Sequence, residues 1–487
     1  MQQLQHRTRA RKLYASIPGI FKCTSIAAVL KNKVFYPASV TYQAEESLYW
    51  SAQQEDQIPT CRIAPTSAKD VSVALSILKA QNCQFAVKSG GHASFAGASN
   101  IDGGVAIDLL NLTSFTVSSD RKQVSVGTGL RWGQVYIKLD AMGLSVIGGR
   151  NSDIGVSGLT LGGGISYFSG IYGWACDNVN NYEVVFANGS IQQVSYTTLP
   201  DLYFALRGGG NNFGIVTRLD LASFEQGKMW GGAFNYGSDT FTSLITAFHW
   251  FNINHPEDPN AAVILAFVWF SPSVGFLGSV DLEYALPVVA PPILSNFTDI
   301  PDLSNSGRIT NLTDLALELA ATQPAGSRET YWACMSQNDE QYLNDVLALW
   351  ETETVKIMNV TGVLPVLVFQ PISLAMISHM SKNGGNALGI TAANGPLVLI
   401  NVSSKWTYTS DDALIQAWAK SVIDKTVSLG KARGVWNRYI YQNYAGQPQD
   451  VFAGYGPVNK AKLVSIHKKY DPNDVFTKLQ PGYFKID

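Results

Sequence analysis

The chain has 487 residues, of which 46% are hydrophobic and 15% charged, and its formal net charge is -2. A chain of this length and composition is expected to fold into two or more domains with sizeable cores. The low charge argues against nucleic-acid binding, which needs a basic face, and no apolar run reaches the roughly 20 residues that cross a bilayer.

Cysteine spacing and sequons bear on metal binding and cellular location. The five cysteines lack the C-x-x-C spacing of a zinc site, so we expect no metal centre, and we take Cys23 and Cys61 as a candidate disulfide pair. Sequons that fit a secretory route begin at Asn111, Asn188, Asn296, Asn311, Asn359 and Asn401. The N-terminus is basic like a signal peptide, but Ser16 and Pro18 interrupt its apolar region. We therefore predict a secreted protein, with a cytosolic one as the alternative.

Residues 1–54 are predicted to form a helical lead-in without recognisable chemistry. Ser67 and Asp70 then have the spacing of a capping box, and the apolar residues that follow predict a helix of roughly four turns. A strand over 85–87 comes next and runs into Ser89-Gly90-Gly91-His92. Adjacent glycines permit positive φ and let backbone N–H groups approach a bulky anion. This turn is therefore our first candidate for a cofactor site.

The elements after the turn alternate between strands and helices. We predict strands over 104–110, 123–127 and 215–221, helices over 132–142 and 200–206, and a hairpin of 182–187 with 191–194 around an Asn-Gly turn. Seven glycines lie between residues 148 and 164, and a second glycine cluster spans 207–214. Because each glycine costs backbone entropy, we interpret the first cluster as a place where a flat or bulky group lies against the main chain. A loose loop is the alternative.

From about residue 228 the pattern indicates a sheet backed by helices. Strands are predicted over 262–270, 363–369 and 397–402, and amphipathic helices over 241–251, 339–351 and 411–429. An aromatic-rich C-terminal segment follows, with a helix over 459–470 that ends at Asp471-Pro472.

Six segments, in this order along the chain, resemble one known family. They are Ser-Gly-Gly-His at 89–92, Gly-Val-Ser-Gly-Leu-Thr-Leu-Gly-Gly-Gly at 155–164, Asp-Asn-Val at 177–179, the segment 201–217 with its Arg-Gly-Gly-Gly-Asn-Asn, Tyr-x-Asn-Tyr at 441–444, and Tyr-Asp-Pro-x-x-Val-Phe at 470–476. Together they resemble flavoprotein oxidoreductases of the vanillyl-alcohol oxidase type, and most of all the berberine-bridge-enzyme-like branch and its fungal members.

The resemblance implies an α+β protein with a bipartite FAD-binding domain and an α+β substrate-binding domain, an antiparallel sheet backed by helices. The FAD-binding domain would comprise residues 55–227 and 435–487, and the substrate-binding domain residues 228–434. His92 would bond covalently to the 8α-methyl of FAD. The other residues expected to bind FAD are Lys88, Ser89, Gly90, Gly91, Ala93, Ser94, Gly149, Asn151, Ile154, Gly155, Gly158, Gly162, Gly163, Gly214, Ile215, Val216 and Asn443.

Two positions modify what the resemblance implies. Many relatives have a second flavin link from a cysteine, but Asn151 occupies that position here, so we expect a single link through His92. In relatives, a valine just before the first glycine of the 155–164 motif admits oxygen. This chain has the bulkier Ile154 there, which leaves both slow oxidase and dehydrogenase behaviour open.

Hydride transfer to flavin needs a base for the proton that the substrate loses. Tyr441 is our first candidate for acid–base catalysis, with Tyr444 and Asn443 beside it, and core packing is the alternative for both tyrosines. The strand over 397–406 faces the flavin in some relatives, but here it contains no carboxylate. It contains Asn401, which cannot be both a pocket residue and a glycosylation site.

The expected function is oxidation of a small or medium organic molecule, a secondary metabolite rather than an oligosaccharide, by FAD. Electrons would pass on to O2 or another acceptor, and the enzyme would be a monomer or a homodimer. One alternative is a redox-neutral isomerase or cyclase in which flavin is structural or absent. Another is a protein that carries FAD without turnover.

Overall fold

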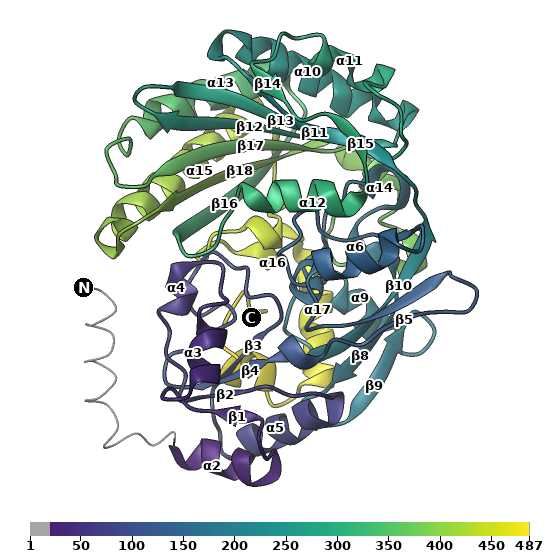
Figure 1. The fold of residues 1–487 in the computed structure, drawn as a ribbon, viewed down its shortest axis with the longest axis vertical. Helices are drawn as coiled ribbons and strands as arrows, with labels where there is room; N and C mark the ends of the chain where they lie inside the picture. Colours follow the sequence, from purple (N-terminus) through teal and green to yellow (C-terminus); the bar gives the residue numbers. More distant parts are fainter. Residues whose placement is uncertain (1–19, 487) are drawn as a thin grey trace.

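The computed structural model describes residues 20–486, with side chains from residue 23 onward. The basic segment considered as a signal peptide falls mostly outside these residues. Figure 1 shows two parts: one built from the N-terminal and C-terminal segments, in purple, blue and yellow, and one built from the green middle of the chain. Within the described residues, no helix has both the length and the apolar character needed to cross a membrane.

The first sheet positions the Ser-Gly-Gly-His turn. Its order is β1 (Val34–Phe35), β2 (Cys61–Ile63), β4 (Val105–Asp108), β3 (Phe85–Lys88), and the last three strands are parallel. The turn follows β3 directly. Helices α2 (Ile20–Val29) and α5 (Ala68–Ala80) pack in the same core, and the side chain of Ser67 caps α5 as predicted, by accepting a hydrogen bond from the Asp70 N–H.

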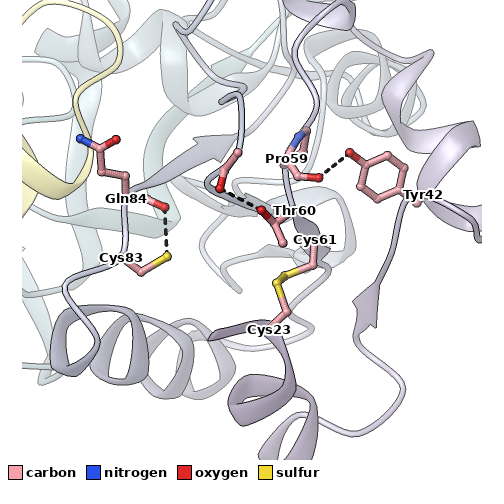
Figure 2. The surroundings of a disulfide bond; sticks show 8 residues. Cys23, Tyr42, Pro59, Thr60, Cys61, Cys83 and Gln84 are labelled. Atoms are coloured by element: carbon pink, nitrogen blue, oxygen red, sulfur yellow. Dashed lines mark hydrogen bonds between the residues drawn. A yellow bond between two sulfur atoms is a disulfide. The ribbon is translucent and has the colours of Figure 1, made fainter. Parts of the chain in front are cut away.

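The predicted disulfide is present. Cys23 in α2 and Cys61 in β2 form a bond that ties the lead-in to the first sheet, as Figure 2 shows. Beside it, the Tyr42 hydroxyl donates to the Pro59 carbonyl, so the segment before β2 is held from two sides. The lead-in is mainly helical, with α3 (Val40–Glu46) and α4 (Ala52–Glu55), but the short strand β1 was not predicted.

A second sheet lies behind the glycine clusters. Its strands run in the order β5 (Phe115–Val117), β6 (Gln123–Gly127), β10 (Ile215–Glu225), β8 (Val179–Val185), β9 (Ile191–Ser195), and β7 (Leu144–Val146) pairs with β10. The helices of this part are α6 (Trp132–Asp140), α7 (Val156–Leu161), α8 (Ser169–Tyr172) and α9 (Pro200–Leu206). The Asn-Gly hairpin is confirmed as β8–β9. Helix α7, within the first glycine cluster, was not predicted.

The middle of the chain forms a nine-stranded antiparallel sheet. Its order is β14 (Ser304–Asn305), β11 (Met229–Tyr236), β13 (Gly275–Tyr284), β12 (Ala261–Ser271), β17 (Leu364–Ile372), β18 (Leu397–Trp406), β16 (Arg328–Gln337), β19 (Trp436–Asn437), with β15 (Arg308–Thr310) beside β11. One face packs with α10 (Phe241–Asn254), α13 (Glu340–Thr354) and α15 (Asp412–Arg433). The other face is directed towards the FAD-binding part. Shorter helices are α11 (Ser295–Thr298), α12 (Leu312–Ala321) and α14 (Leu374–Ser378).

The C-terminal segment returns to the first part of the chain, as a bipartite domain requires. It contains α16 (Val451–Gly454) and α17 (Pro457–Tyr470), and α17 packs against α9. The Tyr470 hydroxyl donates to Asp201, and the Phe484 carbonyl accepts from Asn212. The α+β fold class is thereby confirmed. The residue boundaries of the domains stay predictions, because the lead-in and the segment after 434 also contact the nine-stranded sheet.

Candidate active site

The two glycine motifs meet at the Ser-Gly-Gly-His turn. A Cβ atom built on Gly90 would lie 2.3 Å from the Gly155 nitrogen, and one built on Gly155 would lie 2.3 Å from the Gly90 nitrogen. The main chains therefore touch at a separation that excludes any side chain. Gly91 adopts a φ of 69°, which favours glycine, and the Ser89 hydroxyl donates to the Thr128 carbonyl.

His92 is half-buried, and its imidazole has the environment of a neutral ring. Its ring stacks on Trp50 with a centroid distance of 4.3 Å, and its Nε2 is buried without a hydrogen-bond partner among the described residues. Burial lowers the pKa of His92 to about 3, so the ring is uncharged at neutral pH. Trp50 comes from the lead-in and was not predicted at the site. Its backbone N–H donates to the Gly91 carbonyl, which holds it beside the turn.

A cavity of about 740 Å³ lies between this turn and the nine-stranded sheet. Most of the predicted cofactor-binding and catalytic residues line it: Ser89, Gly90, Gly91, His92, Ala93, Ser94, Asn151, Ile154, Gly155, Gly158, Gly214, Ile215, Val216, Tyr441, Asn443 and Tyr444. None of the five cysteines lines it, and the free ones, Cys83, Cys176 and Cys334, are buried elsewhere.

Four of the residues predicted to bind the cofactor do not line the cavity: Lys88, Gly149, Gly162 and Gly163. Lys88 forms a buried ion pair with Asp108, with 2.9 Å between Nζ and Oδ2. Gly162 supports the wall from behind, because a Cβ there would lie 2.1 Å from Oδ1 of Asn443. Lys88 and Gly162 thus contact residues of the site without facing the cavity themselves.

The two tyrosine hydroxyl groups of the Tyr-x-Asn-Tyr segment have different hydrogen-bond partners. The Tyr441 hydroxyl oxygen accepts from the Ile165 N–H at 3.2 Å and from Asn443 Nδ2 at 3.0 Å. Burial raises the pKa of Tyr441 above its usual value of 10, so its hydroxyl keeps its proton at neutral pH. The Tyr444 hydroxyl instead accepts from Arg150 Nη2 at 3.0 Å. The geometry thus favours Tyr441 as a positioning group, and its role as a base stays a prediction.

Two cavity carboxyl groups were missed in the sequence. Strand β18 supplies Asn401, Ser403 and Lys405 without a carboxylate, as predicted, but Glu329 of β16 and Asp281 of β13 also line the cavity. Glu329 pairs in register with Lys405 across the sheet. Burial raises the pKa of Glu329 to about 8 and that of Asp281 to about 7. No local signal marks these residues, because only strand pairing brings them to the cavity.

Asn401 belongs to the cavity and is not a glycosylation site in the folded protein. The residue is 4% exposed, and Nδ2 donates to the Trp332 carbonyl at 3.0 Å. A glycan on this nitrogen would need it at the surface and would displace that hydrogen bond. Of the two interpretations of Asn401, the pocket one therefore holds.

The raised pKa of Glu329 makes a pH-dependent contribution to stability. The folded protein holds this proton more tightly than the unfolded chain, so the stabilisation is complete below pH 4.5 and is lost as the pH rises to about 8. As the pH rises from 4.5 to about 8, we expect the thermal unfolding midpoint of the native protein to fall relative to that of a Glu329→Gln variant, whose side chain stays neutral. Thermal unfolding of both proteins at several pH values checks this, and parallel curves would refute the assigned shift.

The residues present fit a flat cofactor with polar edges. Besides His92 Nε2, both side-chain polar atoms of Gln442 and Oε1 of Gln480 are buried without partners among the described residues, and both glutamines line the cavity. Gly158 also lines it, and a Cβ there would meet no protein atom within 4 Å. Buried polar atoms are normally hydrogen-bonded, so these atoms are suited to bind a ligand. Within residues 20–486, no cluster of three or more His, Cys, Asp and Glu side chains could hold a metal ion.

Comparisons with known proteins agree with this fit. Residues 59–195 match a family described as an FAD binding domain. The FAD-dependent monooxygenase tpcD of Cochliobolus heterostrophus is 38% identical, over 93% of this chain and 89% of that protein. The FAD-dependent monooxygenase FUP4 of Fusarium proliferatum is also 38% identical, over 90% of this chain and 87% of that protein. The chain belongs to the family of FAD-dependent oxidoreductases that includes these monooxygenases, and its fold is that of solved berberine-bridge-enzyme-like proteins.

Solved structures share the fold of this FAD-dependent oxidoreductase. The 6-hydroxy-D-nicotine oxidase of Arthrobacter nicotinovorans has a TM-score of 0.78 at 19% identity, over 94% of this chain and 98% of that one. A chitooligosaccharide oxidase has a TM-score of 0.74 at 19% identity, over 95% and 100%. The predicted family, cofactor and enzyme class are therefore confirmed. The redox-neutral alternative is not favoured.

Proposed function

We propose that this FAD-dependent oxidoreductase oxidises a small or medium apolar organic molecule, a secondary metabolite rather than an oligosaccharide, in the cavity beneath the nine-stranded sheet. FAD supplies the chemistry, by accepting a hydride from the substrate and passing the electrons on to an acceptor. The observation that carries the proposal is the composition of the sheet face that covers the cavity.

The surface that lines the cavity is mostly apolar, and the sheet supplies a continuous part of it. Alternate residues of each strand point to opposite faces, and those facing the cavity include Ile264, Ala266, Val268, Leu277, Leu364, Val366 and Val368. The intervening side chains, such as Leu265 and Phe267, pack in the core with the helices behind the sheet. Asn235, Ser279, Asn401 and Ser403 add small polar groups, and Asp281, Glu329 and Lys405 add ionisable ones. An apolar wall with a few polar groups is typical of a pocket for a hydrophobic small molecule.

Anaerobic mixing tests the proposed function. The FAD-loaded protein is mixed with a panel of apolar phenols and alcohols and, separately, with oligosaccharides, and the visible flavin absorbance is recorded. We expect bleaching by at least one apolar compound. Faster bleaching by an oligosaccharide would contradict the substrate class, and conversion of substrate without bleaching would favour a redox-neutral reaction.

We propose His92 as the covalent attachment point of FAD. A neutral imidazole with one unpartnered nitrogen in the cavity supports this, because an unprotonated lone pair is what bond formation needs. After acid precipitation, we expect the yellow colour to remain in the protein pellet and to appear in the supernatant for His92→Ala. His379→Gln, which changes a histidine outside the cavity lining, should leave the pellet yellow. Equal colour in the native and His92→Ala pellets would exclude this attachment.

We propose O2 as the electron acceptor, because two of the most similar relatives are named monooxygenases. Ile154 lines the cavity beside Gly155 and is expected to slow access of oxygen compared with a valine.

We also propose a secretory route. The Cys23–Cys61 disulfide persists best in an oxidising compartment, and the sequons at Asn188 and Asn296 are exposed. A mobility shift of the secreted protein on endoglycosidase treatment would support this, and its absence would count against it.

A further inference from the structure

Arg150 is a buried cation in the cavity wall that has no ion-pair partner. Its side chain lies where the first glycine cluster meets the sheet, and the residue is 8% exposed. Its Nη2 donates to Gln370 Oε1 at 2.7 Å and to the Tyr444 hydroxyl at 3.0 Å. Among the side chains described, those of residues 23–486, the guanidinium forms no ion pair, and its hydrogen bonds go to Gln370 and Tyr444. Buried charges are normally paired, so this one is suited to an anion that the chain does not supply.

The titratable groups around Arg150 do not supply that anion. From β13 it faces Asp281 and Glu283, with Glu318 of α12 behind them, and the other groups are tyrosines: Tyr167, Tyr441 and Tyr444. Burial raises the pKa of Asp281 to about 7 and that of Glu283 well above its usual value. Burial also raises the pKa of Tyr167 and of Tyr441. The positive charge of Arg150 is therefore not fully balanced near neutral pH.

The geometry of the guanidinium restricts the kind of anion. An arginine binds a carboxylate through two parallel N–H groups, and both pairs suited to this, Nε with Nη2 and Nη1 with Nη2, include an Nη2 hydrogen. Gln370 and Tyr444 occupy the two hydrogens of Nη2. The remaining donors, on Nε and Nη1, suit a single anionic oxygen better than a carboxylate.

We infer that Arg150 binds the ionised hydroxyl oxygen of the substrate, and that this enzyme acts on phenols or enols whose apolar body lies against the sheet. This inference rests on the proposed function, because it takes the cavity as the substrate site. In binding, the substrate O–H bond breaks, the electron pair stays on oxygen next to Arg150, and the proton passes to solvent. A substrate bound in this form needs no separate base for that proton, which agrees with the high pKa of Tyr441.

Calorimetry on the FAD-loaded protein tests the inference without turnover. The probes are 4-nitrophenol and 4-nitroanisole, which is the same molecule with its hydroxyl methylated. Titrations in two buffers of different ionisation enthalpy, at a pH below the pKa of 4-nitrophenol, report the protons released. We expect tighter binding of 4-nitrophenol, with release of close to one proton. Arg150→Gln should lose about ten- to hundred-fold in affinity for 4-nitrophenol, together with the proton release.

Two further variants make the test specific. Arg150→Lys keeps the positive charge, so binding of 4-nitrophenol should still release a proton. This variant provides a test of the charge even if Arg150→Gln does not fold. Lys228→Gln removes an exposed cation outside the cavity lining and should change the affinity for 4-nitrophenol less than three-fold, roughly the effect of a weak surface charge. An equal loss in Lys228→Gln would overturn the specific role of Arg150.

Other outcomes would also overturn the inference. These are equal binding of 4-nitroanisole by the native protein, binding without proton release, or an Arg150→Gln variant that binds 4-nitrophenol normally but has a shifted flavin reduction potential. The last result would assign the guanidinium to the flavin. Failure of the proposed function looks different, because then no apolar compound bleaches the flavin, whatever residue 150 is.

Discussion

An Asp108→Ala variant is expected to lose about 3–5 kcal/mol of unfolding free energy, because it breaks a buried charge cluster beneath the Ser-Gly-Gly-His turn. Asp108 Oδ2 accepts from Arg62 Nη1 at 2.7 Å and from Lys88 Nζ at 2.9 Å. The side chains of Arg62 and Asp108 are 0% exposed and that of Lys88 is 2% exposed. Without the carboxylate, two buried cations share one fewer anion.

Urea unfolding, followed by tryptophan fluorescence, measures this loss. The matched control is Asp424→Ala, which breaks an ion pair with Lys420 whose side chains are 58% and 57% exposed. Such a surface pair contributes less than about 1 kcal/mol. Equal destabilisation by the two variants would contradict the importance of the buried cluster. Because Lys88 directly precedes the turn, Asp108→Ala should also lower the ratio of bound flavin to protein.

A Gly155→Ala variant is expected to retain little or no FAD and to lose about 3 kcal/mol or more of stability through overpacking. The new methyl group would lie 2.3 Å from the Gly90 nitrogen and 2.7 Å from its Cα. Both atoms belong to the main chain, so relief requires the two glycine motifs to move apart. That movement displaces the turn that carries His92. The flavin-to-protein absorbance ratio and the urea midpoint report the two effects.

Two glycine variants serve as controls for this clash. Gly227→Ala adds a methyl group with no atom within 4 Å and outside the cavity lining, so it should behave like the native protein. Gly158→Ala also meets no protein atom, but Gly158 lines the cavity. It should fold normally and bind FAD less well. If Gly155→Ala matched Gly227→Ala in both measurements, the close approach of the two motifs would be unimportant.

These variants test different layers of one arrangement. The charge cluster of Arg62, Lys88 and Asp108 holds the end of the first sheet, the contact between Gly90 and Gly155 joins that sheet to the first glycine cluster, and His92 projects into the cavity above. A variant that disrupts the charge cluster or the glycine contact should therefore also weaken FAD binding. His92→Ala changes only the residue in the cavity and should leave the free energy of unfolding close to native.

The sequence alone was enough to predict those helices, strands and turns whose defining residues lie close together in the chain. The strand over 123–127 and the helix over 200–206 were predicted at the bounds that the structure has. The Ser67 cap and the Asn-Gly hairpin were predicted because their hydrogen bonds join residues close in the chain. The glycine motifs likewise predicted a site for a bulky cofactor, since the missing side chains are themselves the signal.

Tertiary structure alone decided which side chains share the cavity. Trp50 stacks on His92 from 42 positions away, and Glu329 and Asp281 come from strands that sequence patterns did not single out. Strand β16 reads as a mixed polar and apolar run, because one of its faces lines a cavity and the other a core. Arg150 becomes an unpaired buried cation only when Gln370 of β17 and Tyr444 close around it. Such neighbours are set by strand register and by the packing of distant segments, which single-sequence periodicity does not encode.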